Sequence, residues 1–493
     1  MEQLLKKLNE LPELREAAAC LENGKSPVAL SGVQSAQRAA VGAAIAAALG
    51  RPAVFVCGDE QEVRRLAGDL RTLTGQEPVT LLGREWQFRP GAVASRAWEQ
   101  NRLAALYALS AGKAPVCVAA ADALMVRTLP PEKLRSAVRT LKVGARLDLT
   151  ELSAQLTAAG YTRCDQVEGA GQFAVRGGIL DVFSPLMDQP VRCELFDDEI
   201  DSLGAFDTAS QRRVKNLRSA LLLPASEVLP HQAPGGLEGL AAALEKEAEK
   251  LEKRGPSPAA QTLRGDAERL QEGSVPGGMD RYLCAVYPRA AWGADYLPAD
   301  AAVFLSETAR VEERVKGFSL QAKQDTEALL EAGALAGAFS RLTMSGEELY
   351  ARLADFPTVM ESSLPTSRYP IPPKSLANIT AKQLPSYGGS LETAAEDLKH
   401  YRAAGYGVLI LCGGEARAKN LLRILEERDI PAALDLENRA MPETEVVDLR
   451  EELRMGNRSI FSARLKELMK DRLEKGQQIM LFLNRRGYAG FVS

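Results

Sequence analysis

Three side chains in the stretch 171–213 have the types and spacing suited to binding another protein: Arg176, Arg192 and Phe196. A guanidinium group donates charge-assisted hydrogen bonds to carboxylates, and an exposed aromatic ring can fill an apolar pocket. Arginine and aromatic side chains are the usual anchors of protein interfaces. The chemistry expected of this set is therefore recognition of a partner with acidic and apolar groups.

Two predicted strands would position these residues. Side chains alternate between the two faces of a strand, so along the strand 191–196 the apolar odd-numbered residues share one face. Arg192, Glu194 and Phe196 share the other face, which is a poor core and a suitable docking surface. The alternative is a half-solvated antiparallel sheet with ordinary surface charges. The pattern alone leaves both interpretations open.

The preceding strand, 173–176, is predicted to bury Phe173 and Val175 and to turn Arg176 outward. Gly177–Gly178 then supplies a bend or bulge. This rhythm of short strands and turns predicts a β-rich domain.

A second set of residues stands where a motor ATPase would carry G-x-x-x-x-G-K-[ST]. Gly32 is kept, whereas Gln37 replaces the second glycine, Arg38 the lysine and Ala39 the hydroxyl residue. In the intact loop, backbone N–H groups and the lysine bind phosphates and the hydroxyl binds Mg²⁺. We therefore expect this degenerate nucleotide loop to be inactive.

The rest of the sequence offers no catalytic set. Residues 303–307 form an apolar strand that ends in Ser-Glu without the aspartate that holds Mg²⁺. The seven cysteines are scattered and never spaced as C-x-x-C, which predicts no zinc site and no disulfide framework. We predict neither catalytic nor metal-ligating residues.

The composition is that of an ordinary soluble protein. The 493 residues suffice for three or four domains, with 46% hydrophobic and 26% charged residues. A net charge of −4 gives no overall basic field for nucleic acid. No apolar run is long enough to cross a membrane, and the unpaired cysteines favour a reducing cytoplasm.

The order of predicted elements gives an α/β multidomain fold. From residue 25 to 141, buried strands alternate with helices, which predicts a parallel sheet covered on both faces. Residues 282–287 and 301–305 are predicted strands that complete this sheet, and 407–412 is a predicted strand of a later unit. The expected domains are 1–141 (α/β, first part), 142–224 (inserted, β-rich), 225–344 (return to the α/β domain, with a helical hairpin), 345–437 (small α/β) and 438–493.

Three segments carry a resemblance to a known family: FAVRGGILDVF, PVRCELFDDEIDSL and FDTASQR. They resemble the UvrA-binding domain shared by the excision-repair protein UvrB and the transcription-repair coupling factors, in the variant of the latter. The resemblance extends over about residues 1–436. It implies a UvrB-like parallel-sheet domain with a degenerate loop and an inserted UvrA-binding domain, whose contacts with UvrA fall at Arg176, Arg192 and Phe196.

The resemblance implies a non-catalytic part in transcription-coupled nucleotide-excision repair, namely recruitment of UvrA. The family adds a motor that uses ATP and Mg²⁺ to displace stalled RNA polymerase on double-stranded DNA. That motor is expected to be absent from this chain, and with it the cofactors and the modules for RNA polymerase and DNA. In the family the missing part covers the UvrA-binding face, so we expect an open face here.

The last residues, about 438–493, resemble a fragment of the primosomal helicase PriA, most clearly at LFLNRRGYAGFVS. The fragment stops before the zinc-binding cysteines of that family, so we expect an incomplete motor lobe. Two alternatives to recruitment follow. One is an ATP-dependent DNA helicase of the PriA or UvrB type, which would need the missing G-K-[ST] and acidic motifs. The other is a truncated or misjoined product with no function.

Overall fold

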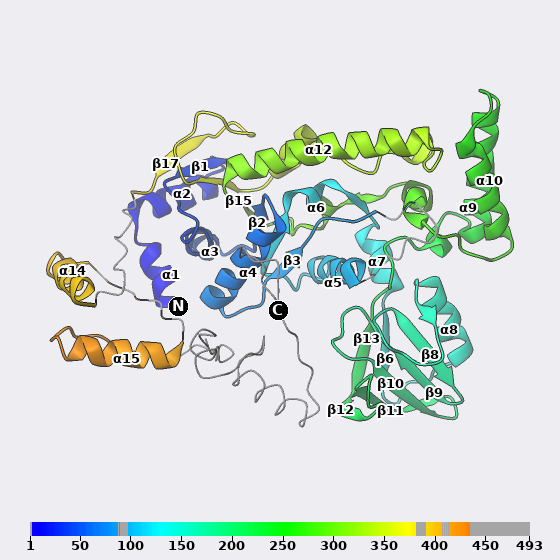
Figure 1. The fold of residues 1–493 in the computed structure, drawn as a ribbon, viewed down its shortest axis with the longest axis horizontal. Coiled ribbons are helices and arrows are strands. Elements are labelled where there is room, and N and C mark those ends of the chain that lie inside the picture. The colour runs from blue at the N-terminus through cyan, green and yellow to red at the C-terminus, as the bar shows by residue number, and fades with distance from the viewer. Residues whose placement is uncertain are drawn as a thin grey trace, which may run out of the picture. The chain divides into compact units, whose positions relative to one another are not determined.

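The computed structural model describes residues 2–86, 88, 97–380, 391–406, 408, 410, 412 and 414–433 (Figure 1). It divides into two compact units, 1–383 and 384–493, which are described separately. The predicted PriA-like segment lies outside the described residues. Within the described part of the chain, none of the helices combines the length and apolarity required to span a membrane.

A seven-stranded parallel sheet forms the centre of the first unit. Its strand order is β17-β1-β16-β15-β2-β4-β3. The strands are β1 (Val28–Ser31), β2 (Ala53–Cys57), β3 (Val79–Leu81), β4 (Val116–Ala120), β15 (Ala302–Leu305), β16 (Thr358–Ser362) and β17 (Ser375–Asn378). Every residue of β2, β4, β15 and β16 is buried, as expected for parallel strands covered on both faces.

Helices on this sheet begin and end where local chemistry places their termini. The helices before the insertion are α1 (Glu2–Leu8), α2 (Pro12–Glu22), α3 (Arg38–Leu49), α4 (Glu60–Thr74), α5 (Ala97–Ser110), α6 (Ala121–Met125) and α7 (Pro131–Ala137). Asp59 caps α4 by accepting a hydrogen bond from the Glu62 backbone N–H at 2.7 Å. In α3, a side chain at Gly42 would clash with the Phe55 ring, so glycine permits close packing of α3 on β2.

The inserted domain is a second, mainly antiparallel sheet with strand order β12-β11-β10-β9-β8-β7. Its strands are β7 (Thr162–Arg163), β8 (Gln172–Arg176), β9 (Ile179–Val182), β10 (Val191–Phe196), β11 (Glu199–Phe206) and β12 (Arg213–Leu217). The strands β6 (Arg139–Lys142) and β13 (Ser219–Leu222) pair beside it. Helix α8 (Leu149–Ala158) packs Leu152 and Leu156 against Phe173 in the core of this domain.

Chain segments after the insertion return to the parallel-sheet domain. The remaining elements of the first unit are β5 (Arg127–Thr128), β14 (Ala291–Trp292), α9 (Gly236–Glu252), α10 (Pro258–Gln271), α11 (Leu283–Val286), α12 (Thr308–Glu331), α13 (Gly346–Leu353) and four short 3₁₀ turns at 230–232, 279–282, 293–296 and 337–339. The second unit contains α14 (Leu391–Ala403) and α15 (Glu415–Glu426). Figure 1 shows α9 and α10 as a hairpin reached by the far end of α12, where Thr262 donates a hydrogen bond to the Gly333 carbonyl.

Two sequence predictions about these segments are wrong. Residues 282–287 are not a strand, because a 3₁₀ turn at 279–282 leads directly into α11. A separate unit does not begin at residue 345, because β16 and β17 pair with β15 and β1 in the first sheet. The predicted strand 407–412 falls partly outside the described residues, and its described positions, 408, 410 and 412, carry no strand.

A buried ionic network lies where the chain leaves the inserted domain. Glu227, which follows β13, is fully buried and accepts a hydrogen bond from Arg84 at 2.7 Å. It also pairs with Arg102 on α5 at 3.1 Å and accepts a hydrogen bond from Thr128 at 2.6 Å. Its own backbone N–H donates to Glu99 at 2.7 Å. The Glu227 carboxylate thus connects the end of the insertion to three segments of the parallel-sheet domain, those that contain Arg84, Arg102 and Thr128.

Candidate protein-binding surface

Three adjacent strands of the inserted domain carry the predicted residues. Arg176 ends β8, and Arg192 and Phe196 lie on β10, with β9 between the two strands. The turn between β8 and β9 is the two-residue pair Gly177–Gly178, and Gly177 has φ +59°, where glycine avoids strain. A tight hairpin turn therefore stands where the sequence predicted a bend or bulge.

Asp181 on β9 connects the two arginines and was missed by the sequence prediction. Its carboxylate accepts a hydrogen bond from Arg176 at 2.7 Å and two from Arg192, at 2.7 and 2.9 Å. Asp181 stands directly opposite Arg192 in the antiparallel register, and only 1% of its surface is exposed. One feature of the sequence could have identified it. Asp181 is the single charged residue in the apolar strand 179–182, and strand alternation turns its side chain away from the core.

Arg192 is held more firmly than Arg176. Its guanidinium also donates to the side chain of Gln211 at 3.0 Å and lies 4.5 Å from the centre of the Phe206 ring. Its side chain is 21% exposed, against 53% for Arg176. The hydrogen bonds with Asp181 raise the pKa of the Arg192 guanidinium, so its positive charge is secure at any physiological pH.

Phe196 projects from the same face of β10 and is 79% exposed, the largest value for a large hydrophobic side chain among the described residues. It comes four residues after Arg192, about 13 Å along an extended strand. It directly precedes the turn Asp197–Asp198, in which Asp197 adopts φ +57°. Aromatic and arginine side chains are the usual anchors of protein interfaces, so an exposed ring on a strand that also carries Arg192 is a candidate contact. The structure thus places a fixed arginine pair and a free ring on one face.

The degenerate nucleotide loop is filled by the protein's own groups. The side-chain oxygen of Gln37 accepts a hydrogen bond from the Gln34 backbone N–H at 2.9 Å, so an amide of the loop already has a partner. Gly32 has φ +80°, and the Ile379 carbonyl approaches it so closely that a side chain there would clash. Ala39 is buried. These contacts use one of the backbone donors that a phosphate group would need and place a carbonyl oxygen against Gly32.

Arg38 replaces the loop lysine and points into an internal ion-pair network. It pairs with Glu62 at 2.7 Å, with Glu307 at the end of β15, and with the Ser363 hydroxyl at 3.0 Å. Arg38 is 4% exposed. Because its guanidinium is neutralised by two carboxylates, it has little charge left for a nucleotide. The residues present do not fit ATP with Mg²⁺.

Comparison with known proteins identifies the relatives of this chain. Residues 140–228 match the family described as the UvrB interaction domain. The transcription-repair-coupling factor of Bacillus subtilis (strain 168) is 28% identical over 457 residues, which is 91% of this chain and 38% of that protein. The factor of Myxococcus xanthus is 28% identical over 424 residues, 82% of this chain and 35% of that protein.

Over most of its length the chain is similar to the transcription-repair-coupling factors. It spans less than two-fifths of the length of these relatives. The predicted resemblance to the transcription-repair coupling factors and the predicted α/β class with an inserted β-rich domain are confirmed. The resemblance of residues 438–493 to PriA stays a prediction. The matched range 140–228 contains β8, β9 and β10, so the candidate surface lies within the part related to UvrB.

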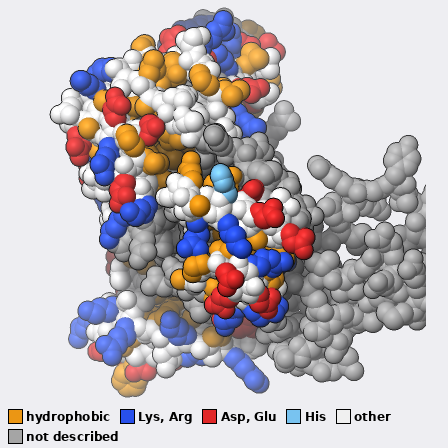
Figure 2. Space-filling model, turned by 90° about the vertical axis from the view of Figure 1, so that its left-hand side faces the viewer, with side chains coloured by type: hydrophobic (Ala, Val, Ile, Leu, Met, Phe, Trp, Pro, Cys, Tyr) orange, Lys and Arg blue, Asp and Glu red, His pale blue; other side chains and the backbone are white. Residues whose placement is uncertain are grey.

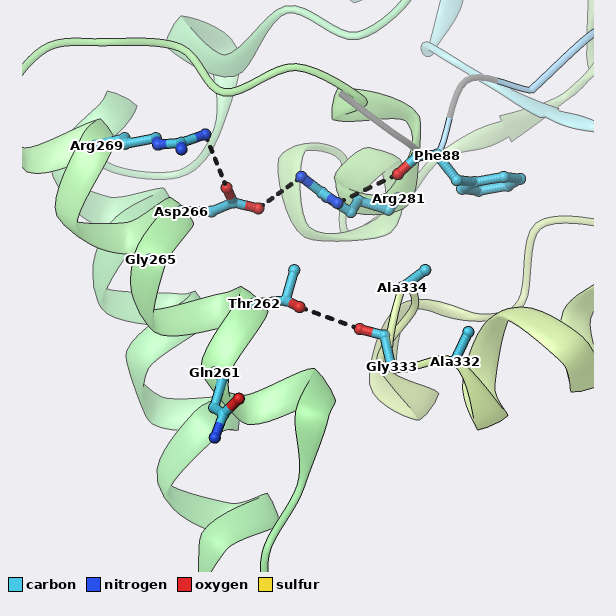
Figure 3. A pocket seen from close by; sticks show the side chains of 10 residues that line it. All are labelled: Phe88, Gln261, Thr262, Gly265, Asp266, Arg269, Arg281, Ala332, Gly333 and Ala334. Atoms are coloured by element: carbon cyan, nitrogen blue, oxygen red, sulfur yellow. Dashed lines mark hydrogen bonds and ion pairs between the residues drawn. The ribbon is translucent and has the colours of Figure 1, made fainter. Parts of the chain in front are cut away.

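A pocket in the parallel-sheet domain lies away from the surface described above. It has a volume of about 370 Å³ and is lined by α10, the turn around Arg281 and the end of α12 (Figure 3). Arg281 pairs with Asp266 at 2.7 Å and donates to the Phe88 carbonyl at 3.2 Å. Because Arg281 and Asp266 are paired with each other, we assign this pocket no ligand. Among the described residues, no group of three or more His, Cys, Asp or Glu side chains is arranged to hold a metal ion.

Glu361 gives the parallel-sheet domain an expected pH dependence. This residue of β16 is fully buried, and neither carboxylate oxygen has a hydrogen-bond partner. Burial raises its pKa to about 8 despite nearby Arg38. The folded state therefore holds a proton that the unfolded state, with a pKa of about 4.3, releases. Stability should fall as pH rises between these two values, because deprotonation leaves a buried, unpaired charge.

The measurement is the urea midpoint of unfolding at pH 6 and pH 8.5 for the wild type and for Glu361→Gln. The wild type should lose stability at the higher pH, and the neutral variant should lose clearly less. Equal pH dependence in both proteins would show that Glu361 is not the group responsible.

Proposed function

We propose that this chain binds UvrA through the β8–β10 face of its inserted domain and thereby serves transcription-coupled nucleotide-excision repair by recruitment. The observation that carries the proposal is the exposed Phe196 ring on β10, the strand that also carries the fixed Arg192, inside the segment that matches the UvrB interaction domain. Arg176 and Arg192 would donate hydrogen bonds to carboxylates of UvrA. Phe196 would fill an apolar pocket at the centre of the interface.

The proposal limits this chain to a local docking role. Figure 2 shows basic and acidic side chains interspersed on the face that it draws, and the net charge is −4. Such a distribution favours a short-range, geometrically defined contact over broad attraction to nucleic acid. We therefore propose UvrA as the partner of this chain and assign neither RNA polymerase nor DNA to its described residues.

The direct test is a calorimetric titration of the full chain into UvrA from the same organism. We expect saturable binding at one site per UvrA-binding domain. An affinity in the micromolar range or tighter corresponds to about −8 kcal/mol or better. No heat of binding from a folded chain, shown by circular dichroism, would refute the proposal.

The contacts within the degenerate loop predict that this chain does not bind ATP. The Gln37 side chain already accepts the Gln34 backbone N–H, and Arg38 is paired with Glu62. A titration of the chain with ATP and Mg²⁺ should show no saturable binding at millimolar nucleotide. A dissociation constant in the micromolar range, lost on substitution of Arg38, would contradict the assignment and revive the helicase alternative.

A further inference from the structure

Asp181 is the centre of the candidate surface and is itself almost inaccessible. Its two oxygens receive three hydrogen bonds, one from Arg176 and two from Arg192, all between 2.7 and 2.9 Å. It lies on the face of β9 that points away from the hydrophobic core, because its neighbours Leu180 and Val182 are the residues packed in that core. The arginine side chains rather than core residues therefore cover it.

We propose that Asp181 is a positioning residue for partner binding. It fixes the two guanidinium groups before the partner arrives, so that Arg176 presents its free edge to a carboxylate on the partner. This inference rests on the proposed function, since it assigns a role within the same surface. A free arginine side chain has many rotamers, and binding a partner carboxylate would otherwise have to restrict them. Immobilising it in advance removes part of the cost of association.

The two arginines have different parts in this arrangement. Arg192 donates through several nitrogens to Asp181 and Gln211 and lies over Phe206, so most of its binding capacity is used internally. Arg176 has a single hydrogen bond, to Asp181, among the described residues, and about half of its side chain is exposed. Arg176 therefore has the more accessible donors for a partner carboxylate. Arg192 has fewer donors left for the partner and also helps to hold Asp181 in place.

Removal of the Asp181 charge should free the guanidinium groups of Arg176 and Arg192 from their shared hydrogen-bond acceptor. Two like charges would then lie close together without a shared counter-charge, and the flexible Arg176 side chain would lose its fixed direction. The substitution Asp181→Asn keeps the size of the side chain and one acceptor oxygen but removes the charge. We expect it to weaken UvrA binding by about tenfold or more.

A double-mutant cycle separates positioning from a general structural effect. Affinity for UvrA is measured for the full chain with Asp181→Asn, Arg176→Ala and both together. If Asp181 acts through Arg176, the double variant should bind about as weakly as Arg176→Ala alone, because the two losses overlap. In the matched control cycle, Asp181→Asn and Phe196→Ala should show losses that multiply. Wild-type affinity in Asp181→Asn, or multiplying losses in both cycles, would overturn the inference.

A second measurement does not require the variant to fold. The order parameter of the Arg192 Nε–H group in the free wild-type chain, from ¹⁵N relaxation, should approach the value of about 0.85 for rigid backbone. A value below about 0.6 before UvrA is added would overturn the positioning role. If the wild type does not bind UvrA at all, the proposed function fails instead, so the two failures are distinguishable.

Discussion

Substitution Phe196→Ala is expected to weaken binding of UvrA at least about thirtyfold without lowering the Tm of the chain. Loss of a central aromatic anchor costs about 2 kcal/mol or more, and 1.4 kcal/mol corresponds to a factor of ten. The ring is 79% exposed in the free chain, so its removal leaves no cavity. Isothermal calorimetry gives the affinity, and differential scanning calorimetry gives the Tm.

The matched control is Val214→Ala on the edge strand β12, where an apolar side chain is 59% exposed but lies outside the β8–β10 face. Its affinity for UvrA should equal that of the wild type. If Phe196→Ala binds UvrA as tightly as this control, the ring is not an anchor. The alternative of an ordinary half-solvated sheet would then be the better interpretation of this face.

Substitution Glu227→Ala is expected to destabilise the chain by about 3–5 kcal/mol, the typical cost of removing one partner from a buried ion pair. Arg84 and Arg102 each have about 1% of their side chains exposed, so both would lose a counter-charge that water cannot replace. Since Glu227 follows the last strand of the inserted domain, the loss should also loosen the attachment of that domain to the parallel-sheet domain. Urea-induced unfolding followed by circular dichroism measures the effect.

An exposed acidic residue, Asp355, provides the control for this substitution, because Asp355→Ala removes a carboxylate that has no ion pair in the described part of the chain. Its unfolding free energy should lie within about 0.5 kcal/mol of the wild type, as for most surface substitutions. A Glu227→Ala variant as stable as this control would mean that the buried network contributes nothing to the junction.

The sequence predicted that Arg192 and Phe196 share one face of their strand because strand periodicity is a local property. Alternation along 191–196 is enough to place Arg192 and Phe196 on one side, and the structure agrees. Asp181 escaped the prediction because its role depends on pairing between β9 and its neighbours. A pairing register is not encoded within one strand.

The two wrong predictions about the fold also arise because tertiary contacts cannot be inferred from a short segment alone. The apolar run 282–287 is as compatible with a buried helical turn as with a strand, and a run this short does not distinguish them. Residues 358–362 form a strand that inserts between β1 and β15, and only the tertiary structure shows this pairing. The predicted boundary at residue 345 failed for that reason. A strand identified locally does not reveal the sheet to which it belongs.

Hydrogen–deuterium exchange of the full chain, with and without UvrA from the same organism, tests the central claim most directly. We predict that UvrA slows amide hydrogen exchange in peptides covering 172–182 and 191–199, which contain the arginine pair, Asp181 and Phe196. Exchange around the filled loop, 32–39, should not change. Protection confined to other segments, or no protection at saturating UvrA, would contradict the assignment of this face as the UvrA-binding surface.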